Sequence, residues 1–357
     1  MPEGHTVNVV NVLTAGAANV IRDTGVNGTM ATSGPLWISE ADVAALMDMR
    51  AAIAALEKGL LLEARGEAMN MLKTHVTWDG GSTLHAIGAT FPKLGLAGTK
   101  TWAHTKGGAT PLLILFDSHD GSLKAIIEAF ALGQMRTASA SGVATQRLAT
   151  KAASAFAIIG TGKQAMTQVQ AVLSVRPIRR VFVYGRDAER RRQFADRVQD
   201  RFHIETLAVE SVEEAVRDAN IITVVTRATE PVLYARTIAP GTHINAVGAI
   251  VPERAELAAD VMARASAVVV DSVPQARKLS REMMDFYGND ETQWASVQPL
   301  SKLVEAGKVR PREFDITIFK SLGMGISDMA LGAEVYEKAI DSGKGRPCPH
   351  PQRSLPR

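Results

Sequence analysis

The chain has 357 residues, of which 46% are hydrophobic and 22% charged, and its formal net charge is only +3. This length predicts two domains, and so small a charge excludes any argument for nucleic acid or an anionic membrane as the partner. The single cysteine, Cys348, excludes an intramolecular disulfide. With no signal-peptide pattern and no apolar run near ~18 residues, we expect a cytoplasmic enzyme or binding protein.

The N-terminal part of the chain predicts an extension followed by a helix. Residues 1–34 are rich in Gly, Thr, Asn and Ala with weak periodicity, so we expect an extension there and regular structure from Pro35. Ser39 with Asp42 predicts a helix start, because a side chain three residues on can reach back to the cap. Apolar periodicity carries this predicted helix toward Gly66.

Residues 69–128 change to short strands without a long helix. The strand patterns LLILFD (112–117) and LKAIIE (123–128) flank the turn SHDG (118–121). The Asp-Gly pair favours a tight reversal, so these segments predict a β-hairpin.

From about residue 137, predicted strands alternate with helices. Nearly continuous apolar strands in such an alternation predict a parallel sheet covered on both faces, which is the doubly wound Rossmann class of α/β fold. The predicted strands are 155–159, 180–184, 206–209, 221–225, 243–247, 267–270 and 314–319. Helices are predicted to begin at Gln164 and at Ala188, and further helices are predicted over 211–218 and from Gly325 to Ile340. The tail after the last helix is expected to be loose.

The segment GTGKQA (160–165) directly follows the first of these strands and opens a helix, which is the G-x-G-x-x-A arrangement of dinucleotide-binding proteins. Gly160 permits the tight turn, Gly162 lets the backbone approach the pyrophosphate, and Ala165 lets helix and strand pack closely. The helix N-terminus offers N–H groups to the phosphates. The predicted cofactor contacts of this segment are Gly160, Thr161, Gly162, Gln164 and Ala165.

The second strand ends without an acidic residue near Gly185, and Arg186 and Asp187 follow. An acid at this place binds the ribose 2′-hydroxyl of NAD, whereas an arginine suits the 2′-phosphate of NADP. The sequence therefore favours NADP(H), and Asp187 leaves NAD(H) open. Thr226 and Val247, near the ends of two later strands, are expected to face the nicotinamide crevice.

Five motifs in this order resemble the ornithine cyclodeaminase/mu-crystallin family over residues 35–340. They are GTKTWAHT (98–105), EAFALGQMRTASASG (128–142), GTGKQA (160–165), HINAVGA (243–249) and FKSLGM (319–324). The resemblance implies a substrate-binding and dimerisation domain from residues 35–137 and 320–357, with the Rossmann domain, 138–319, inserted between them. It also implies a homodimer that acts on α-amino acids or cyclic imines.

The resemblance assigns roles to four residues. Lys100 matches the active-site lysine of the family, which can move a proton at the substrate. Arg136 matches the arginine that holds the substrate carboxylate, for which a planar guanidinium is suited. A helix expected to start near Arg136 would add a favourable dipole. Lys73 stands where many members carry a second arginine, and Ile250 stands where the cyclodeaminases and alanine dehydrogenases carry an aspartate. Isoleucine can neither pair with an ammonium group nor move a proton, so Ile250 predicts an apolar contact with the substrate.

Three hypotheses on function follow. The first is an NAD(P)-dependent oxidoreductase that moves a hydride between nicotinamide and the α-carbon of an amino acid or cyclic imine. The second is an ornithine cyclodeaminase, an ammonia-lyase that forms proline, against which Ile250 argues. The third is a dinucleotide-dependent small-molecule binding protein with little catalysis, against which the presence of Lys100 and Arg136 argues.

Other ionisable residues leave alternatives open. His75, His85 and His104 are candidate acid–base groups, although structural histidines are the default, and His104 is preferred because it is near Lys100. Their spacing fits no metal motif, so no metal site is expected. Asp328, on the last predicted helix, is expected to be structural or to contact the cofactor.

Overall fold

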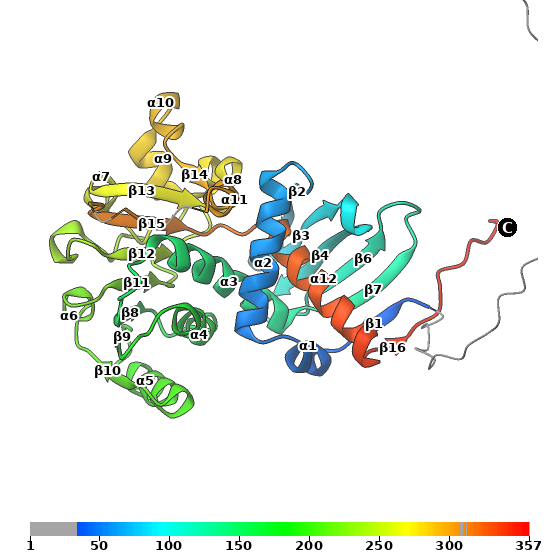
Figure 1. Cartoon of the computed structure of the whole chain (residues 1–357), viewed down its shortest axis with the longest axis horizontal. Helices are drawn as coiled ribbons and strands as arrows, with labels where there is room; N and C mark the ends of the chain where they lie inside the picture. The colour runs from blue at the N-terminus through cyan, green and yellow to red at the C-terminus, as the bar shows by residue number, and fades with distance from the viewer. Residues whose placement is uncertain (1–33, 308–309, 312, 357) are drawn as a thin grey trace, which may run out of the picture. The chain divides into compact units, whose positions relative to one another are not determined.

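The structure is a computed structural model that describes residues 34–307, 310–311 and 313–356 (Figure 1). The predicted extension therefore lies, apart from Gly34, outside the described residues. The described residues belong to one compact unit. Within the described ranges, no helix is long and apolar enough to cross a membrane.

The first of two sheets is mixed and has the strand order β16-β1-β7-β6-β4-β3-β2, with the short β5 paired to β4. Its strands and short 3-10 helices are β1 (Leu36–Ile38), β2 (Met69–Trp78), η1 (Asp79–Gly81), β3 (Ser82–Phe91), η2 (Pro92–Leu94), β4 (Leu96–Thr105), β5 (Gly108–Ala109), β6 (Leu112–Asp117), β7 (Leu123–Glu128) and β16 (Arg346–Pro347). The antiparallel pairing of β6 with β7 confirms the predicted hairpin. The tail is not loose throughout, because β16 pairs with β1.

Four helices pack on or beside this sheet: α1 (Glu40–Leu46), α2 (Met49–Ala64), α3 (Phe130–Leu148) and α12 (Gly325–Ser342). The capping box of Ser39 and Asp42 is confirmed. The prediction of one helix running toward Gly66 is wrong, because the chain turns extended at Met47 and Asp48 caps a second helix by accepting from the Ala51 N–H. Helix α12 lies beside α2 (Figure 1) and packs against β3 and β4.

The second sheet is all parallel and has the order β10-β9-β8-β11-β12-β15-β13-β14. Its strands are β8 (Ala155–Ile159), β9 (Arg180–Tyr184), β10 (Glu205–Ala208), β11 (Ile221–Val224), β12 (His243–Ala246), β13 (Ala265–Val270), β14 (Gln298–Pro299) and β15 (Ile316–Lys320). The seven predicted strands agree with the observed ones to within two residues at each end. Phe156 and Ile158 join one apolar cluster and Ala157 and Ile159 another, so both faces are buried. This confirms the predicted α/β Rossmann class.

The remaining helices follow the strands of the parallel sheet. They are α4 (Ala165–Val175), α5 (Ala188–Phe202), α6 (Val212–Val216), η3 (Ala235–Thr237), α7 (Ala259–Ala263), α8 (Val273–Leu279), α9 (Arg281–Tyr287), α10 (Glu291–Trp294) and α11 (Leu300–Glu305). The chain runs from β8 to β9 and β10 on one side, then returns to β11 on the other side of β8. Ligands of such sheets bind at the carboxyl ends of the strands where the order reverses, which here is between β8 and β11.

Candidate active site

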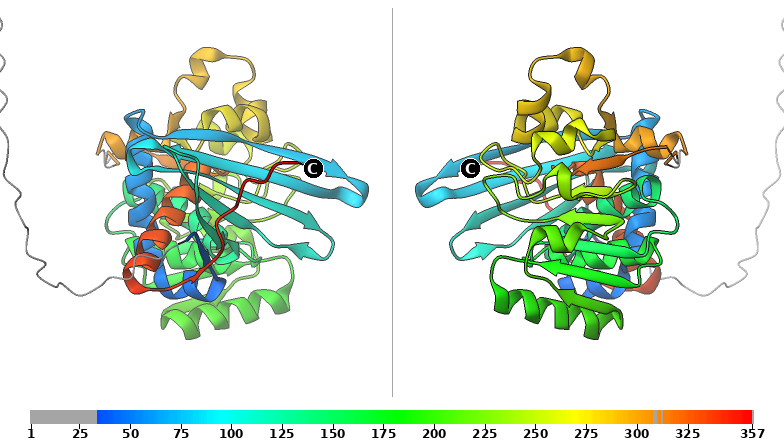
Figure 2. Two further views of the ribbon diagram at one scale, coloured as in Figure 1. Left: turned by 90° about the vertical axis from the view of Figure 1, so that its right-hand side faces the viewer. Right: turned by 90° about the vertical axis from the view of Figure 1, so that its left-hand side faces the viewer.

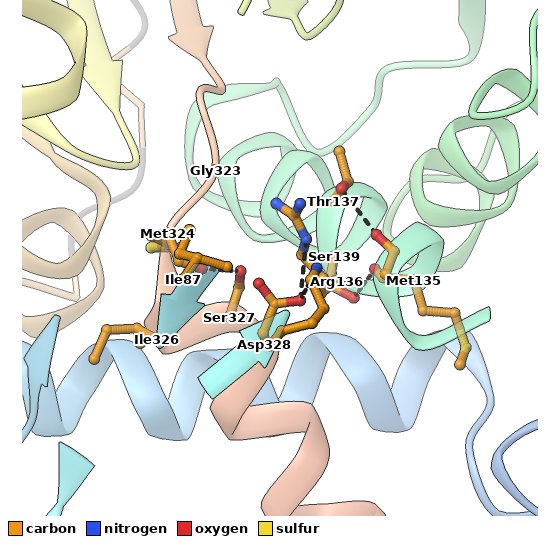
Figure 3. Close-up of polar contacts among 12 residues, drawn as sticks. Ile87, Met135, Arg136, Thr137, Ser139, Gly323, Met324, Ile326, Ser327 and Asp328 are labelled. Atoms are coloured by element: carbon orange, nitrogen blue, oxygen red, sulfur yellow. Dashed lines mark hydrogen bonds and ion pairs between the residues drawn. The ribbon is translucent and has the colours of Figure 1, made fainter. Parts of the chain in front are cut away.

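A buried lysine, carboxylate and arginine meet where the last helix lies over the mixed sheet. Lys100 on β4 is 4% exposed, and its Nζ lies 2.5 Å from Oδ1 of Asp328, which is fully buried in the first turn of α12. Nε of Arg136 lies 3.4 Å from the same oxygen. Figure 3 shows Arg136 on α3 and Asp328 on α12 pointing toward one another. Asp328 thus joins the two residues that the sequence singled out.

The environment of Lys100 makes its ammonium easy to deprotonate. Burial, together with the smaller effects of the positive charges of Arg136 and Lys73, lowers its pKa to about 8, although Asp328 works in the opposite direction. The Nζ also lies 5.1 Å from the centre of the Trp102 ring. A lysine with a pKa near neutrality can give and take protons at the pH of the cell.

Two polar atoms of this cluster are buried without a hydrogen-bond partner among the described residues. They are Nε of Arg136 and Oδ2 of Asp328. Buried polar atoms are nearly always satisfied, so we expect a polar ligand or a water molecule to complete this cluster. Arg136 is the seventh residue of α3, which begins at Phe130. The expectation that a helix starts near Arg136 and adds its dipole there is therefore wrong.

Lys73 lies on β2 at a break in the pairing with β3, where the register shifts between Met71 and Thr74. Such a bulge re-aims the side chains of the bulged strand. Burial lowers the pKa of Lys73, and the nearby charge of Arg136 lowers it further. Lys73 therefore adds a third cation to the surroundings of Lys100 and Arg136.

The three candidate histidines lie on strands β2, β3 and β4. His85 stacks between His75, with ring centres 5.5 Å apart, and Trp102, at 4.7 Å. Burial, followed by the charge of Lys73, lowers the pKa of His85 to about 4, so its ring is neutral at pH 7. His104 is exposed near the end of β4, the strand that also carries Lys100.

A cavity of about 550 Å³ lies at the carboxyl ends of β8, β9 and β11. Its lining includes Gly160, Thr161, Gly162, Arg186, Asp187, Arg190 and Thr226. Gly160 has φ +114°, and a Cβ there would lie 2.5 Å from the Val225 carbonyl oxygen, so only glycine fits. A Cβ on Gly162 would meet nothing within 4 Å, which leaves its backbone open to a ligand.

The other predicted cofactor contacts lie around this cavity. Gln164 caps α4 without a side-chain bond, and Ala165 is fully buried at the start of that helix. A phosphate at this N-terminus would find N–H groups and the positive end of the helix dipole. Val247 is 5% exposed at the end of β12 and is outside the cavity lining, and Ile250 is half-buried three residues later. The residues around the cavity therefore fit a dinucleotide.

The side chain of Asp187 is engaged in a hydrogen bond, whereas that of Arg186 is exposed to the cavity. Asp187 caps α5, because its Oδ1 accepts from the Arg190 N–H at 2.9 Å. Arg186 and Arg190 are exposed and line the cavity. The cavity therefore carries two cations near the end of β9, and the acid beside them, Asp187, is engaged in a helix cap.

The loops that follow β11 and β12 are tied together by Glu256, which the sequence analysis missed. Its fully buried carboxylate accepts from both loops, and no local motif marks it. The sequence analysis also placed Asp328 only as structural or cofactor-bound. An acid in the first turn after FKSLGM was the available signal for it, because such a turn favours a negative charge.

A parallel sheet with a glycine turn at its switch point, together with a lysine of lowered pKa, defines a dinucleotide-dependent enzyme. The chain belongs to the ornithine cyclodeaminase/mu-crystallin family, whose sequence model matches residues 35–343.

Similar proteins include reductases and dehydrogenases. A Δ¹-pyrroline-2-carboxylate reductase of Bacillus cereus is 34% identical over 236 residues, which are 66% of this chain and 72% of the relative. The structure of Thermococcus litoralis Δ¹-pyrroline-2-carboxylate reductase with NADH and L-proline is 30% identical, has a TM-score of 0.82 and covers 88% of this chain and 100% of that one. An archaeal alanine dehydrogenase dimer with bound NAD is 28% identical, has a TM-score of 0.81 and covers 88% and 99%.

These findings agree with the first of the three hypotheses. The chain is an enzyme, an NAD(P)-dependent reductase or dehydrogenase of this family that acts on imines or amino acids.

Proposed function

We propose that the chain interconverts an α-imino acid, cyclic or open, and the corresponding α-amino acid, with Lys100 moving the proton and Arg136 holding the carboxylate. When bound, a nicotinamide would supply or accept the hydride at the α-carbon. The observation that carries the proposal is Lys100, which is buried, has a pKa of about 8 and lies 2.5 Å from Asp328.

Each residue of the cluster has a task in this reaction. The Lys100 ammonium donates a proton to the imine nitrogen during reduction, and the neutral amine takes it back during oxidation. Asp328 orients Lys100 and balances its charge. Arg136, with Lys73 beside it, binds the carboxylate, and this fixes the α-carbon at the face of the cofactor site.

The cyclodeaminase hypothesis requires a further acid–base group near the side chain of the substrate. By the resemblance described above, Ile250 stands where the cyclodeaminases carry aspartate, and its side chain has no group that could bind an amine. Ile250 instead suits an apolar substrate side chain, for which one methylene changes specificity by about 1–3 kcal/mol.

An absorbance assay tests the proposal. Purified enzyme with NADPH or NADH is expected to lose absorbance of the reduced cofactor when a cyclic α-imino acid, or pyruvate with ammonia, is added. L-ornithine is assayed in parallel, with detection of released ammonia. Ammonia release from ornithine without net change of the cofactor would restore the cyclodeaminase, and tight cofactor binding without any turnover would favour the binding protein.

The rate of imine reduction should depend on pH through Lys100. The pKa of this donor is lowered to about 8, and only the protonated form can donate. We expect kcat/KM for reduction to be constant below that pH and to fall above it, while amino-acid oxidation rises over the same range. In Asp328→Asn both transitions should move to lower pH, because Asp328 raises the pKa of Lys100. Profiles that do not move in this variant contradict the assignment.

For the cofactor, we propose that the chain prefers NADP(H) to NAD(H). Arg186 and Arg190 line the cavity at the end of β9, where a 2′-phosphate would lie. Arg186→Ala is expected to weaken NADPH binding by about tenfold, the usual loss for a charge-assisted hydrogen bond, and to leave NADH binding unchanged. Titration of both cofactors by fluorescence checks this. The control is Arg197→Ala, an exposed arginine on α5, the helix that follows Arg186. Equal losses for both cofactors would contradict it.

We also propose that the chain forms a homodimer through the outer face of β2 and β3. The light-blue strands β2 and β3 extend beyond the helices in both views of Figure 2. Cross-strand partners such as Val76 and Leu84 share one face. The exposed apolar side chains on that face are Met69, Met71, Val76, Trp78 and Leu84, each at least 40% exposed. An apolar patch of this kind typically marks an interface.

Light scattering after gel filtration tests the homodimer. The wild-type chain is expected at twice the monomer mass, and the double variant Val76→Asp with Leu84→Asp at the monomer mass, because two charges on each copy would be buried unpaired. Lys106→Asp, in the turn after β4, controls for the added negative charge. A double variant that remains dimeric would show that the interface lies elsewhere.

The division of the chain into one domain of residues 35–137 with 320–357 and a second domain of residues 138–319 stays a prediction. Helix α3 crosses the boundary between these two predicted domains.

A further inference from the structure

The carboxylate of Glu256 joins two loops that lie far apart in the sequence. Its Oε1 accepts from the N–H of Thr226 at 2.6 Å and from the Thr226 hydroxyl at 2.9 Å. Its Oε2 accepts from the N–H of Gly248 at 2.7 Å and from that of Ala249 at 3.0 Å. Each oxygen of the carboxylate thus serves one loop, and the side chain is fully buried.

The close approach of the two loops depends on this arrangement. A Cβ on Gly248 would lie 2.0 Å from the Thr226 carbonyl oxygen and 2.5 Å from Oε1 of Glu256, so the loops meet at a glycine with the carboxylate between them. Without Glu256, three backbone N–H groups that are buried or half-buried would lose their acceptor. Unpaired buried donors are costly, so the loops would have to move.

A second buried pair supports Glu256. The backbone N–H of Glu256 donates to Oε2 of Glu282 at 2.8 Å, and Oε1 of Glu282 lies 2.7 Å from Nζ of Lys320. Lys320 is the last residue of β15, which pairs with β12. The charge of Lys320 also lowers the pKa of Glu256, against the larger effect of burial, which raises it. Glu256 and the two loops that it joins are therefore held to the parallel sheet through Glu282 and Lys320.

The two loops lie at the carboxyl ends of β11 and β12, on the side of the switch point opposite to β9 and β10. In a doubly wound sheet the two halves of a dinucleotide lie on the two sides of this point. The adenosine half belongs with Arg186 at the end of β9, so the nicotinamide half belongs with the loops that Glu256 holds. Residues 225–232 form part of the cavity wall.

We propose that Glu256 is a positioning residue that fixes the loops after β11 and β12 against the nicotinamide half of the cofactor. It does not touch the reacting atoms, and it acts through the backbone of Thr226, Gly248 and Ala249. This inference rests on the proposed function for the identity of the cofactor. Ile250, which is expected to face the substrate, directly follows Gly248 and Ala249. The hydrogen bonds of Glu256 to these two residues therefore also set the position of Ile250.

The test compares the two halves of the cofactor in binding, without turnover. Glu256→Gln keeps the size of the side chain but replaces one acceptor oxygen with a donor, and Glu256→Asp is too short to reach both loops. Dissociation constants for NADH and for ADP, which lacks the nicotinamide half, are measured by calorimetry. Glu253→Gln is the matched control, because Glu253 lies in the same loop and is exposed.

We expect both variants to bind NADH about tenfold more weakly or worse, the loss of a hydrogen bond to a charged group, while ADP binding and the control stay within about twofold. Unchanged NADH binding in both variants overturns the proposal. An equal loss of NADH and ADP also overturns it, because Glu256 would then support the whole fold and not the nicotinamide side. A wild-type chain that binds neither NADH nor NADPH would instead contradict the proposed function.

Discussion

Replacing Lys100 with methionine is expected to lower kcat for imine reduction by about 10²- to 10⁴-fold, the usual contribution of a positioned acid–base group. Methionine fills similar space but cannot hold a proton, and Arg136 remains beside Asp328 to balance its charge. Binding of the reduced cofactor should change little, because Lys100 lies outside the lining of the dinucleotide cavity. Steady-state rates with a cyclic α-imino acid, together with a cofactor titration, provide the measurement.

The control for this variant is Lys93→Met. Lys93 is an exposed lysine paired with Glu67 beside the same sheet. Its loss should leave kcat unchanged. A Lys100→Met enzyme that keeps more than a tenth of the wild-type kcat would remove Lys100 from the chemistry, and the proton would then have to come from another group or from water.

Replacing Arg136 with methionine is expected to lower kcat/KM by about 10²-fold or more, with most of the loss in KM. Removing one partner of a buried charge pair costs about 2–5 kcal/mol. Arg136 would lose the substrate carboxylate, whereas Lys100 would keep its bond to Asp328. Steady-state kinetics over a wide range of substrate concentration separate the two parameters.

The matched control is Arg147→Met, because Arg147 lies on the same helix and pairs with Glu57. It should leave KM unchanged. An Arg136→Met enzyme that loses kcat at unchanged KM would contradict the carboxylate role and would indicate that Arg136 acts on Lys100.

The parallel sheet could be predicted from the sequence because its strands are buried on both faces. Each reads as a short apolar run, and the alternation with helices is regular. The mixed sheet could not be predicted in the same way, since β2 carries polar residues such as Lys73 and Thr74 on an exposed ribbon. The first turns of α3, before Arg136, were missed because Gly133 has weak helix propensity, which packing overrides.

Only part of the candidate site could be predicted from the sequence. The family motifs identified Lys100 and Arg136, and the glycine turn at 160–165 identified the dinucleotide-binding part of the site. Asp328 lies 228 residues from Lys100, so no local pattern links them. Glu256 was missed because its partners are backbone N–H groups of loops, which leave no signature in the side chains.

The most direct test of the account follows the hydride itself. The enzyme is incubated with a cyclic α-imino acid and reduced nicotinamide cofactor that carries deuterium at its transferable position, and the amino-acid product is analysed by mass spectrometry and NMR. The amino-acid product is expected to carry one deuterium per molecule, at the α-carbon. Product without deuterium, or deuterium that remains on the cofactor while ammonia is released from ornithine, would contradict it.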